Sequence, residues 1–166
     1  MPGAASDEGN TPIAVPHWRM GIMKPLEEAT VAQGFTWNAV PIVLGLVSAT
    51  EPSASWPLGN DAVDAQPIEG GLIGQMNWQW LRIEILAVPA RYRGQGVGTQ
   101  LMQFAEAIAW KQGCRKAWVD TFSFQAPRFY EKLGYQRFGE LPDYPPGATR
   151  FFYWKHLTAP HEGETS

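Results

Sequence analysis

An apolar segment that runs directly into a glycine-rich turn constrains this chain more than any other part of its sequence. Residues 81–98 read LRIEILAVPARYRGQGVG, and the run that follows is TQLMQFAEAIAWKQG. The first run predicts a buried strand, and the second predicts a helix with apolar residues Leu101, Phe104, Ala105 and Ile108 on one face. A strand that leads through glycines into a helix predicts a phosphate site, because the free N–H groups and the dipole of a helix N-terminus attract anions.

Three kinds of phosphate-binding turn are relevant to this run. A Walker A loop is excluded, because no Gly-Lys-Ser/Thr sequence ends it. A dinucleotide-binding turn would use Gly94, Gly96 and Thr99 in the frame G-x-G-x-x-G, with Asp120 as the ribose-binding acid. No βαβαβ pattern follows, so we disfavour this reading. Asp120, at the end of its predicted strand, would then either face the acceptor or cap the following turn, and we favour the cap. The third alternative starts at Arg93, in the run RGQGVG.

A second motif, APRFYEKLGY, follows at residues 126–135. The run RGQGVG and this motif resemble the two signatures of the GNAT superfamily of N-acyltransferases, Arg/Gln-x-x-Gly-x-Gly/Ala and Ala-x-x-Phe/Leu-Tyr-x-x-x-Gly-Phe/Tyr. The resemblance covers about residues 40–157 and implies one α+β domain with a mixed, mostly antiparallel central sheet flanked by helices. It also implies transfer of an acetyl group from acetyl-CoA, as co-substrate, to a primary amine of a small-molecule or peptide acceptor by direct attack in a ternary complex.

The resemblance further implies residues that bind the cofactor. The strand before the glycines would pair with the pantetheine arm, the turn would bind the pyrophosphate, and side chains after the next strand would complete the site. These residues are Leu86, Ala87, Val88, Arg93, Gly94, Gln95, Gly96, Val97, Gly98, Thr99, Ser123, Gln125 and Tyr130. Many family members carry Asn where this chain has Ser123, so we expect Ser123 or Gln125 to replace that contact.

Two residues are candidates for catalysis. The resemblance implies that Tyr130 protonates the departing CoA thiolate, whereas a structural role would make it a packing residue of its helix. Glu84 is the candidate general base, acting directly or through water, because it lies on the strand that the family turns toward the acceptor. The alternative for Glu84 is an ion pair with Arg82 or exposure to solvent.

The remaining patterns place further elements along the chain. Strands are predicted at 40–49, 69–77, 80–88, 116–122, 135–141 and 149–157, and helices at 25–38 and 126–133. This order is typical of an α+β fold. Alternation places Arg82, Glu84, Leu86 and Val88 on one strand face. The strand at 149–157 is expected at an exposed edge, where a homodimer could form. Residues 1–22 are predicted to be a disordered tail, 23–158 the domain and 159–166 a polar tail. Residues 50–67 would form either a flap over the acceptor site or a surface excursion, and we favour the excursion.

Composition narrows the class of protein. A net charge of −3 is not typical of nucleic-acid binding, and no apolar run approaches the length of a membrane span. A single cysteine and the lack of a signal-peptide pattern at the N-terminus favour the cytoplasm. No His, Cys or acidic pair has metal-ligand spacing, so no metal is expected.

The acceptor is the least constrained part of the prediction. Residues Trp37, Trp56, Trp78 and Trp80, with Glu51, Asp61 and Asp64, would favour a small aromatic or cationic amine. Two alternatives to an enzyme of this kind stay open. One is a non-catalytic acyl-CoA-binding module that regulates a partner, and the other is a nicotinamide-dependent oxidoreductase.

Overall fold

The computed structural model describes residues 17–36, 38–47 and 68–160, so the predicted excursion at 50–67 and the far ends of both tails lie outside it. The chain divides into two units, Met1–Trp37 and Asn38–Ser166. The first contains helix α1 (His17–Ala32), which begins inside the predicted tail and includes Pro25. The sequence predicts a helix over residues 25–38, but the helix starts at His17 and ends at Ala32. Pro25 therefore lies inside it, where the ring removes one backbone hydrogen bond and crowds the preceding turn.

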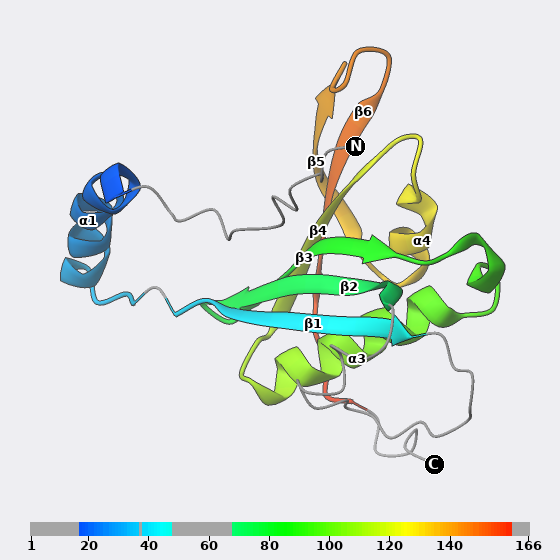
Figure 1. The fold of residues 1–166 in the computed structure, drawn as a ribbon, viewed down its shortest axis with the longest axis horizontal. Coiled ribbons are helices and arrows are strands. Elements are labelled where there is room, and N and C mark those ends of the chain that lie inside the picture. Colours follow the sequence, from blue (N-terminus) through cyan, green and yellow to red (C-terminus); the bar gives the residue numbers. More distant parts are fainter. Residues whose placement is uncertain (1–16, 37, 48–67, 161–166) are drawn as a thin grey trace, which may run out of the picture. The chain divides into compact units, whose positions relative to one another are not determined.

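The second unit is built on one mixed sheet, in the order β1-β2-β3-β4-β6-β5 (Figure 1). Its strands are β1 (Val40–Val47), β2 (Ile68–Asn77), β3 (Trp80–Ala87), β4 (Lys116–Phe122), β5 (Gln136–Pro142) and β6 (Thr149–His156). Only β3 and β4 pair in parallel, and the other neighbours are antiparallel. The predicted fold class is therefore confirmed. The predicted edge position of the last strand is wrong, because β6 lies between β4 and β5.

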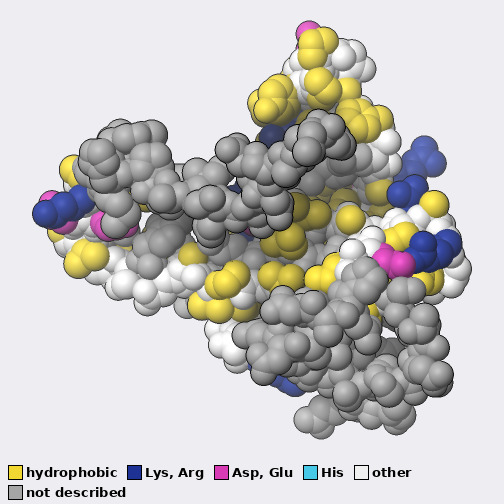
Figure 2. Space-filling view, in the orientation of Figure 1, with side chains coloured by type: hydrophobic (Ala, Val, Ile, Leu, Met, Phe, Trp, Pro, Cys, Tyr) yellow, Lys and Arg dark blue, Asp and Glu magenta, His cyan; other side chains and the backbone are white. Residues whose placement is uncertain are grey.

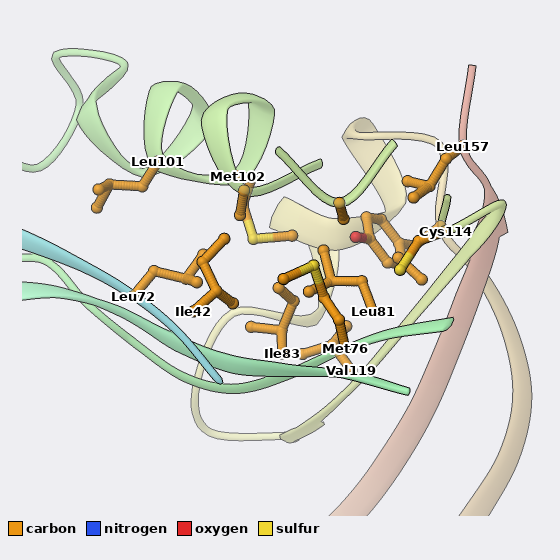
Figure 3. Close-up of a cluster of buried hydrophobic side chains, with 14 of the residues drawn as sticks. Ile42, Leu72, Met76, Leu81, Ile83, Leu101, Met102, Cys114, Val119 and Leu157 are labelled. Carbon is orange, nitrogen blue, oxygen red and sulfur yellow. The ribbon is translucent and has the colours of Figure 1, made fainter. Parts of the chain in front are cut away.

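Two helices cover one face of the sheet and close the hydrophobic core (Figure 3). Helix α3 (Val97–Lys111) connects the parallel strands, and α4 (Pro127–Lys132) follows β4. The residues that α3 buries are Leu101, Met102, Ala105 and Ala109. Phe104 and Ile108 are 48% and 37% exposed, so only Leu101 and Ala105 of the predicted apolar face are buried. The buried face of α3 is instead centred nearer Ala105 and Ala109, whose small side chains let the helix approach the sheet closely.

A β-bulge interrupts the hairpin of β2 and β3. Ile73 pairs with Ile85 and the next residue, Gly74, pairs with Ile83, so Glu84 is the extra residue on β3. A Cβ atom at Gly74 would lie 2.5 Å from the Arg82 carbonyl oxygen, so glycine permits the close approach of the two strands here.

The bulge changes the direction of the side chains that follow it. Arg82 and Glu84 are exposed on the open face, whereas Leu86 and Val88 pack against the core. The prediction that these four residues share a face is therefore wrong, because an extra residue breaks the alternation of period two.

The second face of the sheet carries exposed hydrophobic side chains. Val43, Ile73 and Ile85 are 64%, 39% and 52% exposed, and hydrophobic side chains gather over β1 to β3 in Figure 2. Charged side chains, among them Arg82 and Glu84, lie on this same face. The fold thus separates a core side, closed by α3 and α4, from an open side.

Candidate active site

The two parallel strands at the centre of the sheet part from each other toward their C-terminal ends. Their pairing runs from Trp80 with Lys116 to Ile83 with Val119, although β3 continues to Ala87 and β4 to Phe122. The last residues of each strand therefore present backbone N–H and C=O groups that the other strand does not bond. An extended ligand arm could pair with these groups as an added strand does.

The glycine turn follows directly from the free end of β3. Gly94 and Gly96 have φ angles of +76° and +82°, and Gly96 is the N-cap of α3. Since an L-residue in this left-handed region costs about 1–2 kcal/mol, glycine is the residue that the turn favours. The first hydrogen bond of the helix runs from Gln100 N–H to the Gly96 carbonyl at 3.0 Å. The N–H groups of the preceding residues, 97–99, therefore remain available for an anion.

Side chains of the turn hold its shape. Arg93 donates from Nε to the Val88 carbonyl at 2.9 Å, and Gln95 donates from Nε2 to the Arg91 carbonyl at 2.6 Å. Arg91 forms an ion pair with Glu69 on β2. Arg93 and Gln95, both predicted to bind cofactor, thus also fix the backbone of the turn. The remaining N–H groups of the Arg93 guanidinium can still face a phosphate.

Helix α4 brings Tyr130 to the same end of the molecule. A Cβ atom at Gly98 would lie 3.4 Å from Phe129 Cζ, so α4 packs on the first turn of α3. Tyr130 is 7% exposed. Within residues 38–47 and 68–160 its hydroxyl has no hydrogen-bond partner, whereas Tyr135 donates to Glu106 and Tyr153 to Glu131. Burial, and then the negative charge of Asp120, raises the pKa of Tyr130 to about 12. At neutral pH, Tyr130 is therefore protonated and able to donate.

The two polar side chains predicted after β4 stabilise the turn that leads into α4. Ser123 Oγ accepts a hydrogen bond from Thr149 N–H at 3.1 Å, which ties this turn to β6. Gln125 Oε1 accepts from the Phe122 N–H and from Thr121 Oγ1, both at 3.1 Å. These bonds occupy acceptor oxygens, and they leave the Gln125 amide N–H groups for a ligand.

The carboxylates near the parting strands differ in their surroundings. Glu84 lies 3.4 Å from Arg82, and the side chains are 36% and 45% exposed, so this is a solvent-facing pair. Asp120 accepts from Arg150 Nη2 and Nε, at 2.6 and 2.7 Å, and its side chain is only 16% exposed. The expectation that Asp120 caps a turn is wrong, because Gln125 makes that contact.

Sequence reasoning missed Arg150 as a site residue. The alternation in KAWVDTF could have placed Asp120 opposite the buried Val119 and Thr121, on the open face. Its partner Arg150 becomes evident only from the register of β4 with β6.

An aromatic cavity of about 500 Å³ lies at the other end of these strands. Its lining residues are Trp80, Lys116, Trp118, Phe138 and Trp154. Trp80 and Lys116 begin β3 and β4, whereas the glycine turn follows the end of β3. Trp80 was expected near the acceptor and lies away from the glycine turn, while Trp37 and Trp56 fall outside the described ranges.

Other reactive groups in the described part of the chain form no competing site. Cys114 is buried, and burial raises the pKa of its thiol, which disfavours a nucleophilic thiolate. Across the part of the chain that the structure describes, no three His, Cys, Asp or Glu side chains come together as metal ligands would. The same residues include no helix with the length and apolar character to cross a membrane.

Comparison with known proteins identifies the family. The model of the acetyltransferase (GNAT) family matches residues 49–135, which is more than half of the chain and includes the parting strands, the glycine turn and Tyr130. The chain belongs to the GNAT family. The predicted family and class of enzyme, an acyl-CoA-dependent N-acetyltransferase, are thereby confirmed.

Relatives support this GNAT assignment. The chain is 45% identical to blasticidin-S acetyltransferase of Streptomyces morookaense over 91 residues, which are 54% of this chain and 67% of that protein. It is 40% identical to acetyltransferase Atu2258 of Agrobacterium fabrum over 78 residues, 47% of this chain and 57% of that protein. A crystal structure described as an acetyltransferase from Agrobacterium tumefaciens superposes with a TM-score of 0.69 at 26% identity. That superposition covers 89% of this chain and 97% of the other.

Proposed function

We propose that this GNAT-family protein transfers the acetyl group of acetyl-CoA to a primary amine of a small-molecule or peptide acceptor, by direct attack in a ternary complex. The observation that carries the proposal is the meeting of three features at one end of the sheet. These are the parted ends of β3 and β4, the open N-terminus of α3 behind two left-handed glycines, and the buried Tyr130.

Acetyl-CoA would bind with its pyrophosphate at the N-terminus of α3 and its pantetheine arm along the end of β3. The pyrophosphate would accept hydrogen bonds from the N–H groups of residues 97–99, with the dipole of α3 and the Arg93 guanidinium adding positive charge. The pantetheine arm would pair with the backbone of residues 86–88, on the side of β3 that β4 leaves free. Ser123 and the amide of Gln125 would contact the arm from the turn after β4.

The reaction proceeds by addition and elimination at the thioester carbonyl. The acceptor ammonium first loses a proton to Glu84, directly or through water. The amine nitrogen then bonds to the carbonyl carbon, and a backbone N–H of the parted end of β3 stabilises the oxyanion, a contact worth roughly 3–4 kcal/mol. The C–S bond breaks as the carbonyl re-forms, giving an amide and the CoA thiolate, and the remaining ammonium-derived proton goes to solvent.

Tyr130 would stabilise the departing thiolate. Its pKa of about 12 lies roughly 3.5 units above that of a thiol near 8.5, so complete proton transfer would be uphill by about 5 kcal/mol. A hydrogen bond from the neutral hydroxyl to sulfur avoids that cost, and the thiolate takes its proton from water. The raised pKa of Tyr130 therefore favours a role as hydrogen-bond donor to the thiolate, whereas the family resemblance suggests that it transfers its proton completely.

Blasticidin S is the first acceptor to test, because the relative from Streptomyces morookaense is named for its acetylation. A panel of small primary amines and a lysine-containing peptide would separate small-molecule from peptide acceptors.

Binding of the donor is measured before any acceptor is tried. Acetyl-CoA at 100 times its Kd should stabilise the protein by about 2.7 kcal/mol, and NADH should leave the melting temperature unchanged.

Thiol release then measures turnover. We expect Tyr130→Phe and Glu84→Gln to lower kcat at least tenfold while the Kd for acetyl-CoA changes less than threefold. Glu140→Gln, on the exposed pair with Arg137, is a matched control that should retain full activity. Stabilisation by acetyl-CoA without thiol release for any amine would overturn the catalytic proposal in favour of a non-catalytic acyl-CoA-binding module.

A further inference from the structure

Asp120 occupies the point at which β3 and β4 part. It follows Val119, the last residue of β4 that pairs with β3, and it lies on the face opposite the buried Val119 and Thr121. Its carboxylate is close enough to the Tyr130 hydroxyl for its charge to act on that group. This position puts the carboxylate on the open face of the sheet, next to the end of the β3–β4 pairing.

Arg150 holds this carboxylate in a fixed position. Both of its hydrogen bonds, from Nη2 and Nε, reach the same oxygen, Oδ2 of Asp120. The Arg150 guanidinium is itself packed over the rings of Phe122, Tyr144 and Phe152, with distances of 5.4, 5.7 and 5.6 Å to their centroids. These contacts restrict the arginine, and they leave the lone pairs of Asp120 Oδ1 for another donor.

We propose that Asp120 binds the ammonium group of the acceptor through Oδ1 and that Arg150 positions the carboxylate for this contact. The inference rests on the proposed function and specifies its acceptor site. A protonated primary amine carries several N–H donors, and its hydrogen bond to a shielded carboxylate is charge-assisted and directional. Asp120 thereby places the amine on the open face, beside Glu84 and across from Tyr130, before it loses its proton.

The exposed pair of Arg82 and Glu84 has a different role in this arrangement. Its separation of 3.4 Å and the exposure of both side chains leave the Glu84 carboxylate in contact with solvent, which suits proton transfer to water. The short, shielded pair of Asp120 and Arg150 suits binding. The two carboxylates on neighbouring strands would therefore divide the work on the acceptor between recognition and deprotonation.

The test uses the full chain, acetyl-CoA and the amine from the panel with the highest kcat/KM, starting with blasticidin S. Asp120→Asn retains the size of the side chain but removes its charge. We expect it to raise KM for the amine roughly 10- to 100-fold, the loss of one charged hydrogen bond, while KM for acetyl-CoA changes less than twofold. Glu140→Gln is the control, because it removes a carboxylate paired with an arginine elsewhere on the sheet.

A charge swap separates binding from a purely structural role. The double variant Asp120→Arg with Arg150→Asp restores an ion pair between β4 and β6 but moves the carboxylate to the other strand. If Asp120 only stabilises the fold, the swap should recover the KM for the amine, and this recovery would overturn the proposal. If Asp120 binds the acceptor, the swap variant should melt near the wild type and keep the raised KM.

The remaining outcomes are also decisive. An unchanged KM for the amine in Asp120→Asn, in a protein whose wild type acetylates that amine, would refute the role of Asp120 and leave the acetyltransferase function standing. A wild type that binds acetyl-CoA but acetylates no amine would refute both. If Asp120→Asn does not fold, the swap variant alone decides between the binding and structural roles.

Discussion

Replacement of Gly96 by alanine tests whether α3 depends on a left-handed residue at its N-cap. Gly96 has a φ angle of +82°, and no atom lies within 4 Å of the position of an added Cβ. The cost of the substitution is therefore conformational and not steric, and it amounts to about 1–2 kcal/mol for an L-residue. For a chain of this size, that loss lowers the melting temperature by about 2–8 °C.

Gly98→Ala is the matched control, because it adds the same methyl group two residues later. Gly98 lies inside α3, and its added Cβ would meet Phe129 Cζ at 3.4 Å and Val88 Cγ2 at 3.6 Å, which are ordinary contact distances. Alanine is favoured over glycine inside a helix by up to about 1 kcal/mol. We therefore expect Gly98→Ala to melt at the wild-type temperature or a few degrees above it.

Both variants can be measured by circular dichroism during thermal unfolding, with and without acetyl-CoA. In Gly96→Ala the strained cap should also tilt the N–H groups of the first turn of α3, so the stabilisation by acetyl-CoA should shrink. The reasoning would be refuted by a Gly96→Ala variant as stable as the wild type, or by equal destabilisation in both variants. Either result would mean that the left-handed conformation of Gly96 is not what distinguishes the two sites.

Three further measurements test the interior of the domain. Between pH 10 and 12 an unfolded tyrosine ionises while native Tyr130, with its pKa raised to about 12, largely keeps its proton. The free energy of unfolding should therefore fall over this range by about 2 kcal/mol more than in Tyr130→Phe, as urea titrations at each pH would show. Glu106→Gln should lower the free energy of unfolding by at least about 2 kcal/mol in chemical denaturation. In the wild type the shielded Lys155 ammonium lies 2.7 Å from the Glu106 carboxylate, and the substitution removes this counter-charge. Glu140→Gln, on the exposed pair with Arg137, should lower it by less than about 1 kcal/mol. Cys114, 3% exposed, should react with a thiol reagent at least 100-fold more slowly in the native protein than in guanidinium, and equal rates would contradict its burial.

The parts of the fold that sequence predicted are those encoded by neighbouring residues. The strand β4 occupies the predicted residues, and α4 has Pro127 in its first turn and the positive-φ Gly134 just beyond its end. Proline and glycine limit the backbone where they stand, so their effect can be read without knowledge of the rest of the chain. The glycine turn that precedes α3 is of the same kind.

The predictions that the structure contradicts concern features set by contacts between segments that are distant in sequence. The side-chain alternation of β3 changes at Glu84 because β2 supplies a glycine, Gly74, against which a bulge can form. The buried stripe of α3 is set by the sheet beneath it, and the interior place of β6 is set by its pairing with both β4 and β5. No pattern within a single segment specifies these partners.

The same distinction separates the two halves of the proposed active site. The donor side depends on backbone N–H groups, positive φ angles and the free edge of one strand, which a short motif can encode and a family can share. The acceptor side depends on side chains from different strands, such as Asp120 and Arg150, which meet only through the register of β4 and β6. Because register leaves the identity of each outward-facing residue free to vary, acceptor choice can change without disturbing the donor site. Asp120 and Arg150 are therefore the positions at which exchange with a relative of different specificity should alter the preferred amine while the affinity for acetyl-CoA stays constant.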